Sequence, residues 1–275
     1  MRAGRGASAR RNRWCAALLV FPAGVAAQGA PNRTTLYLHP TDVTDARALW
    51  VNPAGLGRFL EASLHLDLTV GDPGAAGRLQ QFTVGLNSRG FGLGYQRDVF
   101  AGGTRSHTYR LGFAGSQKKL AGGFAAALYR GSRSSTGWEA GILYNAAPAC
   151  TIGGAVENIG RPLVGDSMLP VTFVPGATLR VGGGRGALSA HGRFTADGVV
   201  GYAVGVRAGF RESGPLPLRL LARLDTDRSL RRTGFAFGLS LGGPDLVGAV
   251  ATTPGTLGRL DAVSLYGVST RLFKR

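Results

Sequence analysis

Hydrophobic and polar residues alternate along most of the chain beyond residue 58. Between residues 62 and 68, alanine and leucine occupy every second position, and Ser63, His65 and Asp67 lie between them. A period of two is typical of a β-strand whose two faces meet different surroundings. Thirteen further segments show the same alternation: 81–86, 90–95, 108–113, 124–128, 138–144, 150–156, 177–181, 188–194, 201–210, 219–225, 234–241, 246–251 and 262–272. The pattern predicts an all-β, antiparallel protein of about 14 strands, each close to the length that spans a bilayer.

The connections between these segments alternate in length. Short turns are expected at residues 87–90, 115–118, 146–148, 182–186 and 242–245. Longer loops are expected at 70–77, 98–105, 130–136, 158–172, 225–232 and 252–260. Short periplasmic turns and longer extracellular loops are typical of a transmembrane β-barrel. The rhythm weakens at residues 195–200 and 211–217, where the expected lengths are reversed.

The polar phase of the strands favours a membrane barrel over a soluble sheet protein. It consists mostly of Gly, Ser, Thr and Arg, with few of the Lys and Glu residues that a water-exposed face usually carries. Aromatic residues near strand ends, Tyr95, Tyr129, Trp138 and Tyr144, suit the girdles at membrane interfaces. We therefore predict that the apolar side meets lipid and that the glycine- and arginine-rich side encloses a wet interior. The alternative is a soluble periplasmic β-protein whose apolar residues pack against one another.

The first 27 residues have the three parts of a secretory signal peptide. Five arginines precede a short apolar stretch at residues 16–21, and Val25-Ala26-Ala27 is a small-residue cleavage pattern. A basic tail followed by a buried helix is the alternative interpretation. The predicted organisation is a signal peptide at 1–27, a plug or periplasmic segment at 28–58 and a barrel at 59–275. We expect export to the bacterial outer membrane.

Composition and motifs argue against an enzyme. Two cysteines, Cys15 and Cys150, cannot build a disulfide framework. Ser240 lies in a G-x-S-x-G sequence, but it continues a strand and no helix follows, so a nucleophile elbow is not expected. The four histidines are far apart in sequence, and the glycine run at 182–186 lacks the features of a phosphate loop. We expect no metal, no cofactor and no nucleic-acid partner.

Arginine dominates a formal net charge of +17. Seven arginines occupy the polar phase and are predicted to face the lumen: Arg110, Arg180, Arg193, Arg207, Arg219, Arg223 and Arg271. They are offset there by acidic residues at 61, 67, 139 and 157. Two interpretations stay open: a basic pore that favours anions, and a structural ladder of arginines paired with acids and carbonyls. Loop arginines Arg133, Arg228, Arg231 and Arg232 are candidate contacts for lipopolysaccharide phosphates.

Three short segments resemble a known family. Residues 42–57 contain Asn52, Pro53, Ala54, Gly55 and Leu56, in the sequence NPAGL. Residues 157–162 are similar to an NxGxP segment before a long loop, and residues 266–273 to a barrel-closing strand. These segments resemble the FadL/PorV-like outer-membrane β-barrel superfamily. The resemblance implies a 14-strand barrel with an N-terminal plug. From the residues alone, the plug motif is equally readable as a linker into the first strand.

The resemblance implies one of two functions. The first is a passive channel or transporter for small hydrophobic or anionic solutes, with outer-membrane lipid and lipopolysaccharide around it. The second is a PorV-like structural or secretion-partner barrel without solute flux. FadL-type transporters have long extracellular loops, and a chain of 275 residues leaves no room for them beside 14 strands.

Overall fold

The chain was studied as a computed structural model, which describes residues 35, 37–58, 62–71, 78–99, 105–164, 167–211, 217–254 and 261–271. The predicted signal peptide lies outside these residues. Two short 3₁₀ helices precede the strands: η2 (Ala46–Trp50) and η3 (Pro53–Arg58). A third, η4 (Gly182–Gly184), forms a turn. The strands are β1 (Ala62–Gly71), β2 (Arg78–Ser88), β3 (Phe91–Val99), β4 (Arg105–Gln117), β5 (Leu120–Arg130), β6 (Ser134–Ala147), β7 (Cys150–Ile159), β8 (Leu163–Val164), β9 (Ser167–Met168), β10 (Thr172–Val181), β11 (Gly186–Thr195), β12 (Gly198–Arg211), β13 (Leu218–Asp227), β14 (Arg232–Gly242), β15 (Asp245–Pro254) and β16 (Ala262–Arg271).

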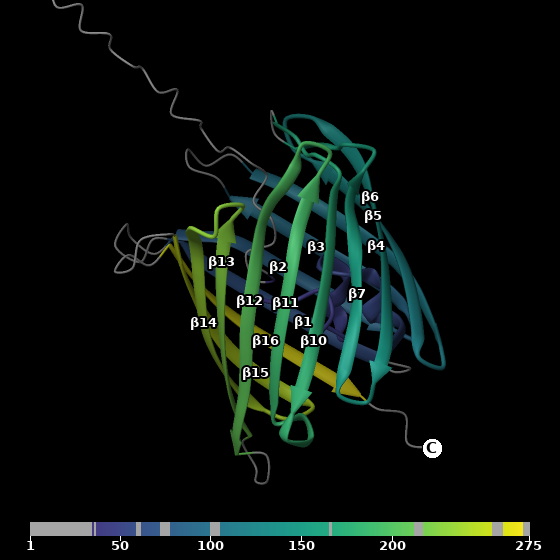
Figure 1. Cartoon of the computed structure of the whole chain (residues 1–275). Helices are drawn as coiled ribbons and strands as arrows, with labels where there is room; N and C mark the ends of the chain where they lie inside the picture. Colours follow the sequence, from purple (N-terminus) through teal and green to yellow (C-terminus); the bar gives the residue numbers. More distant parts are fainter. Residues whose placement is uncertain are drawn as a thin grey trace, which may run out of the picture.

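Fourteen of these strands form one closed antiparallel barrel (Figure 1). Each strand pairs with its neighbour in sequence, and β1 closes the ring by pairing with β16 from Ala62↔Arg271 to Gly71↔Ala262. The remaining two, β8 and β9, form a small hairpin in the connection between β7 and β10. The predicted fold class and strand number are confirmed. Closure leaves no unpaired sheet edge, which is what a sheet in lipid requires.

The apolar phase of the strands faces outward. In β1, Leu64, Leu66 and Leu68 are 38–44% exposed, whereas His65 and Asp67 are fully buried. The same inversion holds around the ring, where Phe113, Ile142, Leu188 and Val204 are each at least half exposed. A soluble sheet protein would bury these side chains, at a gain of about 1.5–3 kcal/mol each. The exterior therefore has the apolar character that lipid, rather than water, accommodates.

Two predicted side-chain directions are wrong. In β16, Ala262, Tyr266 and Val268 point inward and are buried, while Leu265 is 53% exposed on the outside. Tyr129 was predicted to belong to an exterior girdle, but it lines a cavity inside the barrel. Trp138 and Tyr144 do lie on the exterior, each about 40% exposed.

The two ends of the barrel differ as the loop lengths indicate. All five predicted tight turns lie between paired strands at the lower end in Figure 1, which we call the turn end. The predicted reversal at 195–200 is present: only Ala196 and Asp197 separate β11 from β12 at the opposite, loop end. The other, at 211–217, lies mostly outside the described residues. Register shifts at Arg193/Phe194 and Gly209/Arg211 accompany them. β-Bulges of this kind bend a strand and end its regular pairing.

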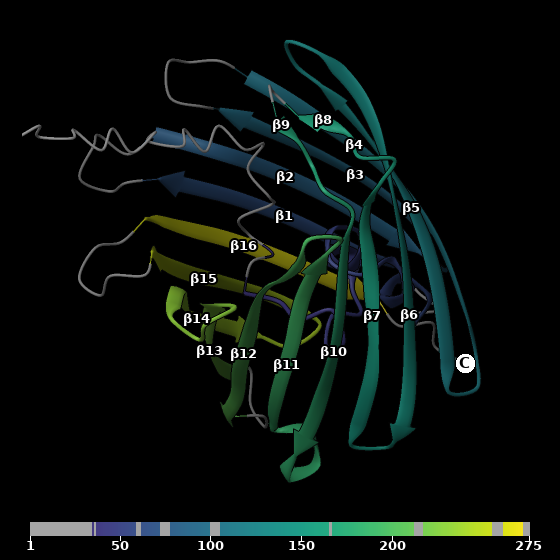
Figure 2. The same cartoon turned by 45° about the horizontal axis from the view of Figure 1, so that its top comes forward.

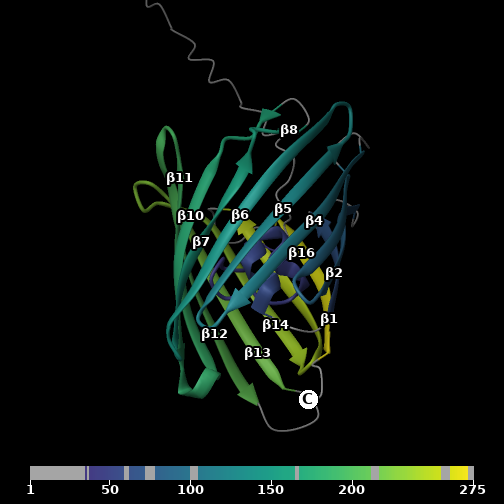
Figure 3. The same cartoon turned by 90° about the vertical axis from the view of Figure 1, so that its right-hand side faces the viewer.

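Residues 37–58 lie inside the barrel, where we call them the lumen segment. Figures 2 and 3 show their purple coils surrounded by the wall. η3 contacts β4, β5 and β6, and η2 contacts β1 to β4. The segment carries the largest cluster of buried apolar residues, Val43, Ala48, Leu49, Trp50 and Leu56, with Ala125 from the wall. The hydrophobic core of this protein therefore lies within the lumen.

Replacing Leu66 by arginine tests the apolar exterior. Leu66 lies mid-way along β1 and is 44% exposed. An arginine near the bilayer midplane of a barrel costs about 2–4 kcal/mol, so we expect a clear loss of folded protein in the membrane fraction. The matched control is Leu230→Arg, because Leu230 is 71% exposed but lies in the β13–β14 turn. Equal yields of the two variants, measured by heat-modifiability on gels, would contradict a lipid-facing exterior.

Candidate functional site

Glycines on the inner face of the wall form the seat of the lumen segment. The Trp50 ring lies against Gly85 and Gly94, where an added Cβ would come within 2.5–2.7 Å of ring carbons. Leu49 and Leu56 occupy the space above Gly92 and Gly112 in the same way. Interiors pack with few voids, so any side chain at these positions would displace the segment. The glycines in these strands are therefore needed to leave room for the lumen segment.

Asn52 ties the segment to the wall through its amide group. Its Nδ2 atom donates to the carbonyl oxygens of Pro40 (2.9 Å), Gly154 (3.3 Å) and Ile142 (3.4 Å), and its Oδ1 accepts from the Ala54 amide (3.1 Å). The side chain is completely buried. Pro53, Ala54, Gly55 and Leu56 are buried beside it, in contact with the wall at β4 to β6. The predicted motif residues thus lie together inside the barrel, against its wall. That they close a pore stays a prediction.

A cluster of rings and charges anchors the start of the segment to β16. Tyr37 stacks on Tyr266 at 5.4 Å between centroids, and Arg47 lies over the Tyr266 ring. Arg47 also donates to the Tyr37 hydroxyl (2.8 Å) and forms a bidentate pair with Asp45. Burial alone raises the pKa of Asp45, but the Arg47 guanidinium outweighs it and holds that pKa below its usual value. This anchor explains why the inner phase of β16 is apolar.

Arg110 and Arg223 hold the segment by its backbone. Arg110 donates to the Leu49 carbonyl (3.1 Å) and to Glu139 Oε1 (2.6 Å). Arg223 donates to the Leu38 carbonyl (2.7 Å) and pairs with Asp225 (2.6 Å). Because both guanidiniums are almost fully buried, they act as structural groups in this arrangement.

Four other predicted arginines also face the interior. Arg180 and Arg207 both reach Asp42 of the lumen segment, at 3.4 and 3.0 Å. Arg193 pairs with Glu157 at 3.4 Å, near the loop end. Arg219 lines a cavity at the turn end, and within the described residues no ion pair of its side chain is found.

Arg271 does not face the lumen, which corrects the prediction. It is 64% exposed and pairs with Asp245 at the turn end of the barrel. The physical reason is the reversed phase of β16. The inner positions of this strand are occupied by Tyr266 and Val268, which pack against Tyr37, so the odd-numbered Arg271 points away.

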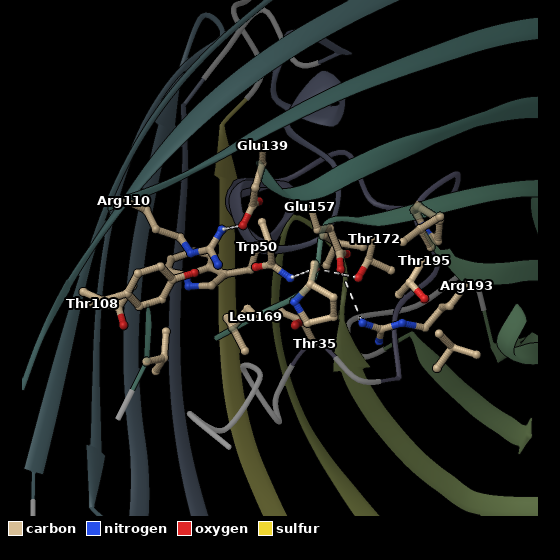
Figure 4. Close-up of a pocket in the computed structure, with 18 of the residues that line it drawn as sticks. Thr35, Trp50, Thr108, Arg110, Glu139, Glu157, Leu169, Thr172, Arg193 and Thr195 are labelled. Carbon is tan, nitrogen blue, oxygen red and sulfur yellow. Dashed lines mark hydrogen bonds and ion pairs between the residues drawn. The ribbon is translucent and has the colours of Figure 1, made fainter. Parts of the chain in front are cut away.

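Within the described part of the chain, two cavities lie against the lumen segment, one toward each end of the barrel. The loop-end cavity, of about 350 Å³, lies between Trp50, Arg110, Glu139, Glu157 and Arg193 (Figure 4). The β8–β9 hairpin covers it with Val164, Met168 and Leu169. The turn-end cavity, of about 530 Å³, is bordered by Asp42, Arg180, Arg207 and Arg219. Asn158 and Gly160, in the NxGxP-like sequence, have positive φ angles of 59° and 88° and turn the chain into the covering loop.

Leu38, His39 and His191 lie between the two cavities, and we call these residues the septum. Leu38 borders both of them, His191 borders the loop-end cavity and His39 the turn-end cavity. The two histidines are joined by an Nδ1···Nδ1 hydrogen bond of 2.9 Å. Such a bond needs one neutral ring to donate and the other to accept. Burial, aided by the Arg223 guanidinium, lowers the pKa of His39 to about 3, so this ring is neutral at physiological pH.

The cavities differ in charge. The loop-end cavity is bordered by three arginines (Arg110, Arg193, Arg223) and three acids (Asp98, Glu139, Glu157), and it also has apolar walls. Among the described residues, those that border the turn-end cavity include four arginines (Arg47, Arg180, Arg207, Arg219) and two aspartates (Asp42, Asp45). A solute therefore meets a balanced, partly apolar chamber at one end and a cationic chamber at the other.

Several of these features escape sequence reasoning. The glycine seat was interpreted as a small, polar pore wall, and the histidines as isolated, although His39 and His191 meet across 152 positions. The signal for the seat is the excess of glycine in the polar phase of residues 85–94 and 112–123. In the described part of the chain, no three His, Cys, Asp or Glu side chains are grouped to hold a metal ion. None of the described helices has the length and apolarity needed to cross a membrane.

Comparison with known proteins places the fold. No family model and no curated protein matches the sequence. Among solved structures, the toluene transporter TbuX of Ralstonia pickettii matches with a TM-score of 0.55 and 13% identity, over 83% of this chain and 94% of that one. The toluene transporter TodX of Pseudomonas putida gives 0.52 and 11%, over 84% and 94%. A Pseudomonas aeruginosa FadL homologue gives 0.51 and 12%, over 84% and 95%. The chain therefore has the fold of the FadL-like outer-membrane transporters, a closed barrel of 14 antiparallel strands.

Proposed function

We propose that this protein spans the bacterial outer membrane and passes small hydrophobic or anionic solutes through its lumen. The apolar exterior and the closed ring of strands support the placement in the membrane. Two of the solved structures that share its fold are toluene transporters. The solute enters at the loop end, and movement of the lumen segment connects the two chambers.

The observation that carries this proposal is the septum. The two cavities, of about 350 and 530 Å³, are large enough for a small organic molecule, and Leu38 borders both. Leu38, His39 and His191 lie between the two cavities, so a shift of the segment at this point would bring the cavities into contact. The polar partners of the segment are side chains and carbonyls that rearrange without breaking the barrel.

The anionic part of the proposal rests on the turn-end chamber. Its arginines outnumber its aspartates, and Arg219 borders it without an ion pair among the described residues. Guanidinium groups bind carboxylates through charge-assisted, often bidentate, hydrogen bonds. We infer that a solute with a carboxylate is stabilised at this end, on the periplasmic side.

A reversible crosslink between segment and wall tests the proposal. The hydroxyls of Thr41 and Thr178 are 2.8 Å apart, one on the lumen segment and the other on β10. We expect a Thr41→Cys/Thr178→Cys variant, made without the native cysteines, to form a disulfide in the oxidising periplasm. Uptake of radiolabelled toluene and of benzoate is then measured in a Gram-negative host without its own channel for them. The oxidised variant should fall to the vector background, and reduction should restore uptake.

The matched control is a crosslink within the wall. Thr69 and Ser264 are also hydroxyl neighbours, at 2.9 Å, but they join β1 to β16. The Thr69→Cys/Ser264→Cys variant should keep its uptake in both redox states. If the cysteine-free parent, shown to be folded in the membrane, takes up neither solute above background, transport is rejected in favour of a barrel without flux.

A further inference from the structure

A row of basic side chains crosses the outer surface of the barrel near the loop end. Arg97 on β3 is paired in register with His107 on β4, and His107 with Arg130 on β5. All three belong to the outward phase, since their neighbours Gln96, Asp98 and Thr108 are buried inside. Arg105 precedes His107 by two positions and lies on the same face of β4.

This row lacks the acidic partners that the interior arginines have. The nearest carboxylate in sequence, Asp98, points inward and accepts from Gln81, Gln96 and Ser106. No ion pair joins Arg97, Arg105 or Arg130 to an acid within the described residues. The Nε atom of Arg97 is buried without a hydrogen-bond partner, and Arg130 donates to the Tyr129 carbonyl. Within the described residues, no acid therefore neutralises the charge of these arginines.

Aromatic residues place this row at the edge of the apolar band. Tyr95 and Tyr109 form the next cross-strand pair toward the middle of the barrel, with centroids 5.4 Å apart. The Tyr95 hydroxyl shares a 2.8 Å hydrogen bond with His107 Nδ1, which fixes that ring beside the arginines. Farther from the loop end on the same outer surface lie Leu93 and Phe113, which are 43% and 52% exposed. Tyrosines of barrel girdles lie at the membrane interface, so the cations are at headgroup depth, with acyl chains beside Leu93 and Phe113.

We propose that Arg97, His107 and Arg130 form a binding site for a phosphate of lipopolysaccharide in the outer leaflet. Neighbouring strands are about 4.8 Å apart, so the backbones of Arg97 and Arg130 are separated by about 10 Å. Long guanidinium side chains at that separation converge on one phosphate group. The apolar surface below accommodates the acyl chains of the same molecule, which is why a phosphoglycolipid fits this surface better than free phosphate does. The inference uses the loop end as the extracellular end and is independent of transport.

The test compares lipid retention in two double variants of the full-length protein. Arg97→Gln/Arg130→Gln removes the proposed site, and Lys118→Gln/Lys119→Gln removes the same charge from the exposed β4–β5 turn at the opposite, turn end. Proteins purified in mild detergent are titrated with lipopolysaccharide, and bound lipid is counted by native mass spectrometry. We expect the first variant to lose at least tenfold in apparent affinity and the second to match the wild type. Heat-modifiability verifies that both barrels are folded.

Two further ligands distinguish the sources of phosphate. Dephosphorylated lipid A should bind the wild type as weakly as lipopolysaccharide binds the Arg97→Gln/Arg130→Gln variant. Inorganic phosphate at the same concentration should not compete. Equal affinity of the two double variants for lipopolysaccharide, or effective competition by inorganic phosphate, would overturn the proposal. Cell fractionation of the same variants separates a failure of the site from a failure of outer-membrane placement.

Discussion

Replacing Arg110 by leucine is expected to destabilise the protein by about 3–5 kcal/mol, the range seen when one partner of a buried ion pair is removed. Glu139, which is only 6% exposed, would lose the 2.6 Å hydrogen bond and ion pair from Arg110 and be left buried without that partner. The Leu49 carbonyl of the lumen segment would lose its donor as well. Urea unfolding of the barrel in lipid vesicles measures the effect as a shift of the midpoint at constant slope.

A second substitution separates the pair from the packing. In Arg110→Leu/Glu139→Leu both charges are gone, so most of the lost stability should return, because removing both partners leaves no uncompensated buried charge. Arg271→Leu is the matched control, since the Arg271–Asp245 pair is more than 60% exposed and water screens it. Equal midpoints for Arg110→Leu and Arg271→Leu would show that Arg110 does not stabilise the segment.

Replacing Gly94 by leucine is expected to expel the lumen segment from its seat. A Cβ at Gly94 would come within 2.7 Å of two Trp50 ring carbons and 2.8 Å of Leu49. The wall on this side is hydrogen-bonded backbone and cannot yield, so the segment must move. Overpacking of this kind costs about 1–3 kcal/mol. We expect the segment to become accessible to added protease and uptake of toluene to rise several-fold.

Gly122→Leu is the control for this substitution. Gly122 lies on the outer face of β5, and the nearest atom to its added Cβ is 4.0 Å away. This variant should resemble the wild type both in protease resistance and in uptake. Increased uptake in both variants would mean that leucine disturbs the barrel itself, and unchanged uptake in both would mean that the segment does not control the path.

The arginines predicted to face the lumen differ in their partners, which bears on the two alternatives of a basic pore and a structural ladder. Arg110 and Arg223 are structural, because they bind segment carbonyls and buried acids. Among the described residues, Arg180, Arg207 and Arg219 border a chamber with more arginines than acids, and the proposed binding of anions depends on these arginines. Inward-facing arginines thus fall into two groups, and the group to which each belongs depends on its depth in the barrel.

The order of strands, their number and the direction of most side chains follow from the sequence itself. Alternation is a local property: once residues 62–71 form a strand, Leu64 and Leu66 share a face and His65 and Asp67 share the other. The shortage of Lys and Glu on the polar face then indicates that the apolar face contacts lipid. The positions of the described turns follow too, including the short connection at residues 196–197.

Only the tertiary structure decided what fills the interior. Alternation shows that a strand has two different faces, but it does not show which face is inside when both carry apolar residues. In β16 the inward face is apolar, because Tyr266 and Val268 pack on Tyr37. For that reason the direction of Arg271 could not be predicted. The meeting of His39 with His191, and of Asn52 with Gly154, spans more than 100 positions and depends on closure of the ring. Such contacts are set by the shape of the lumen, which exists only when all 14 strands are paired.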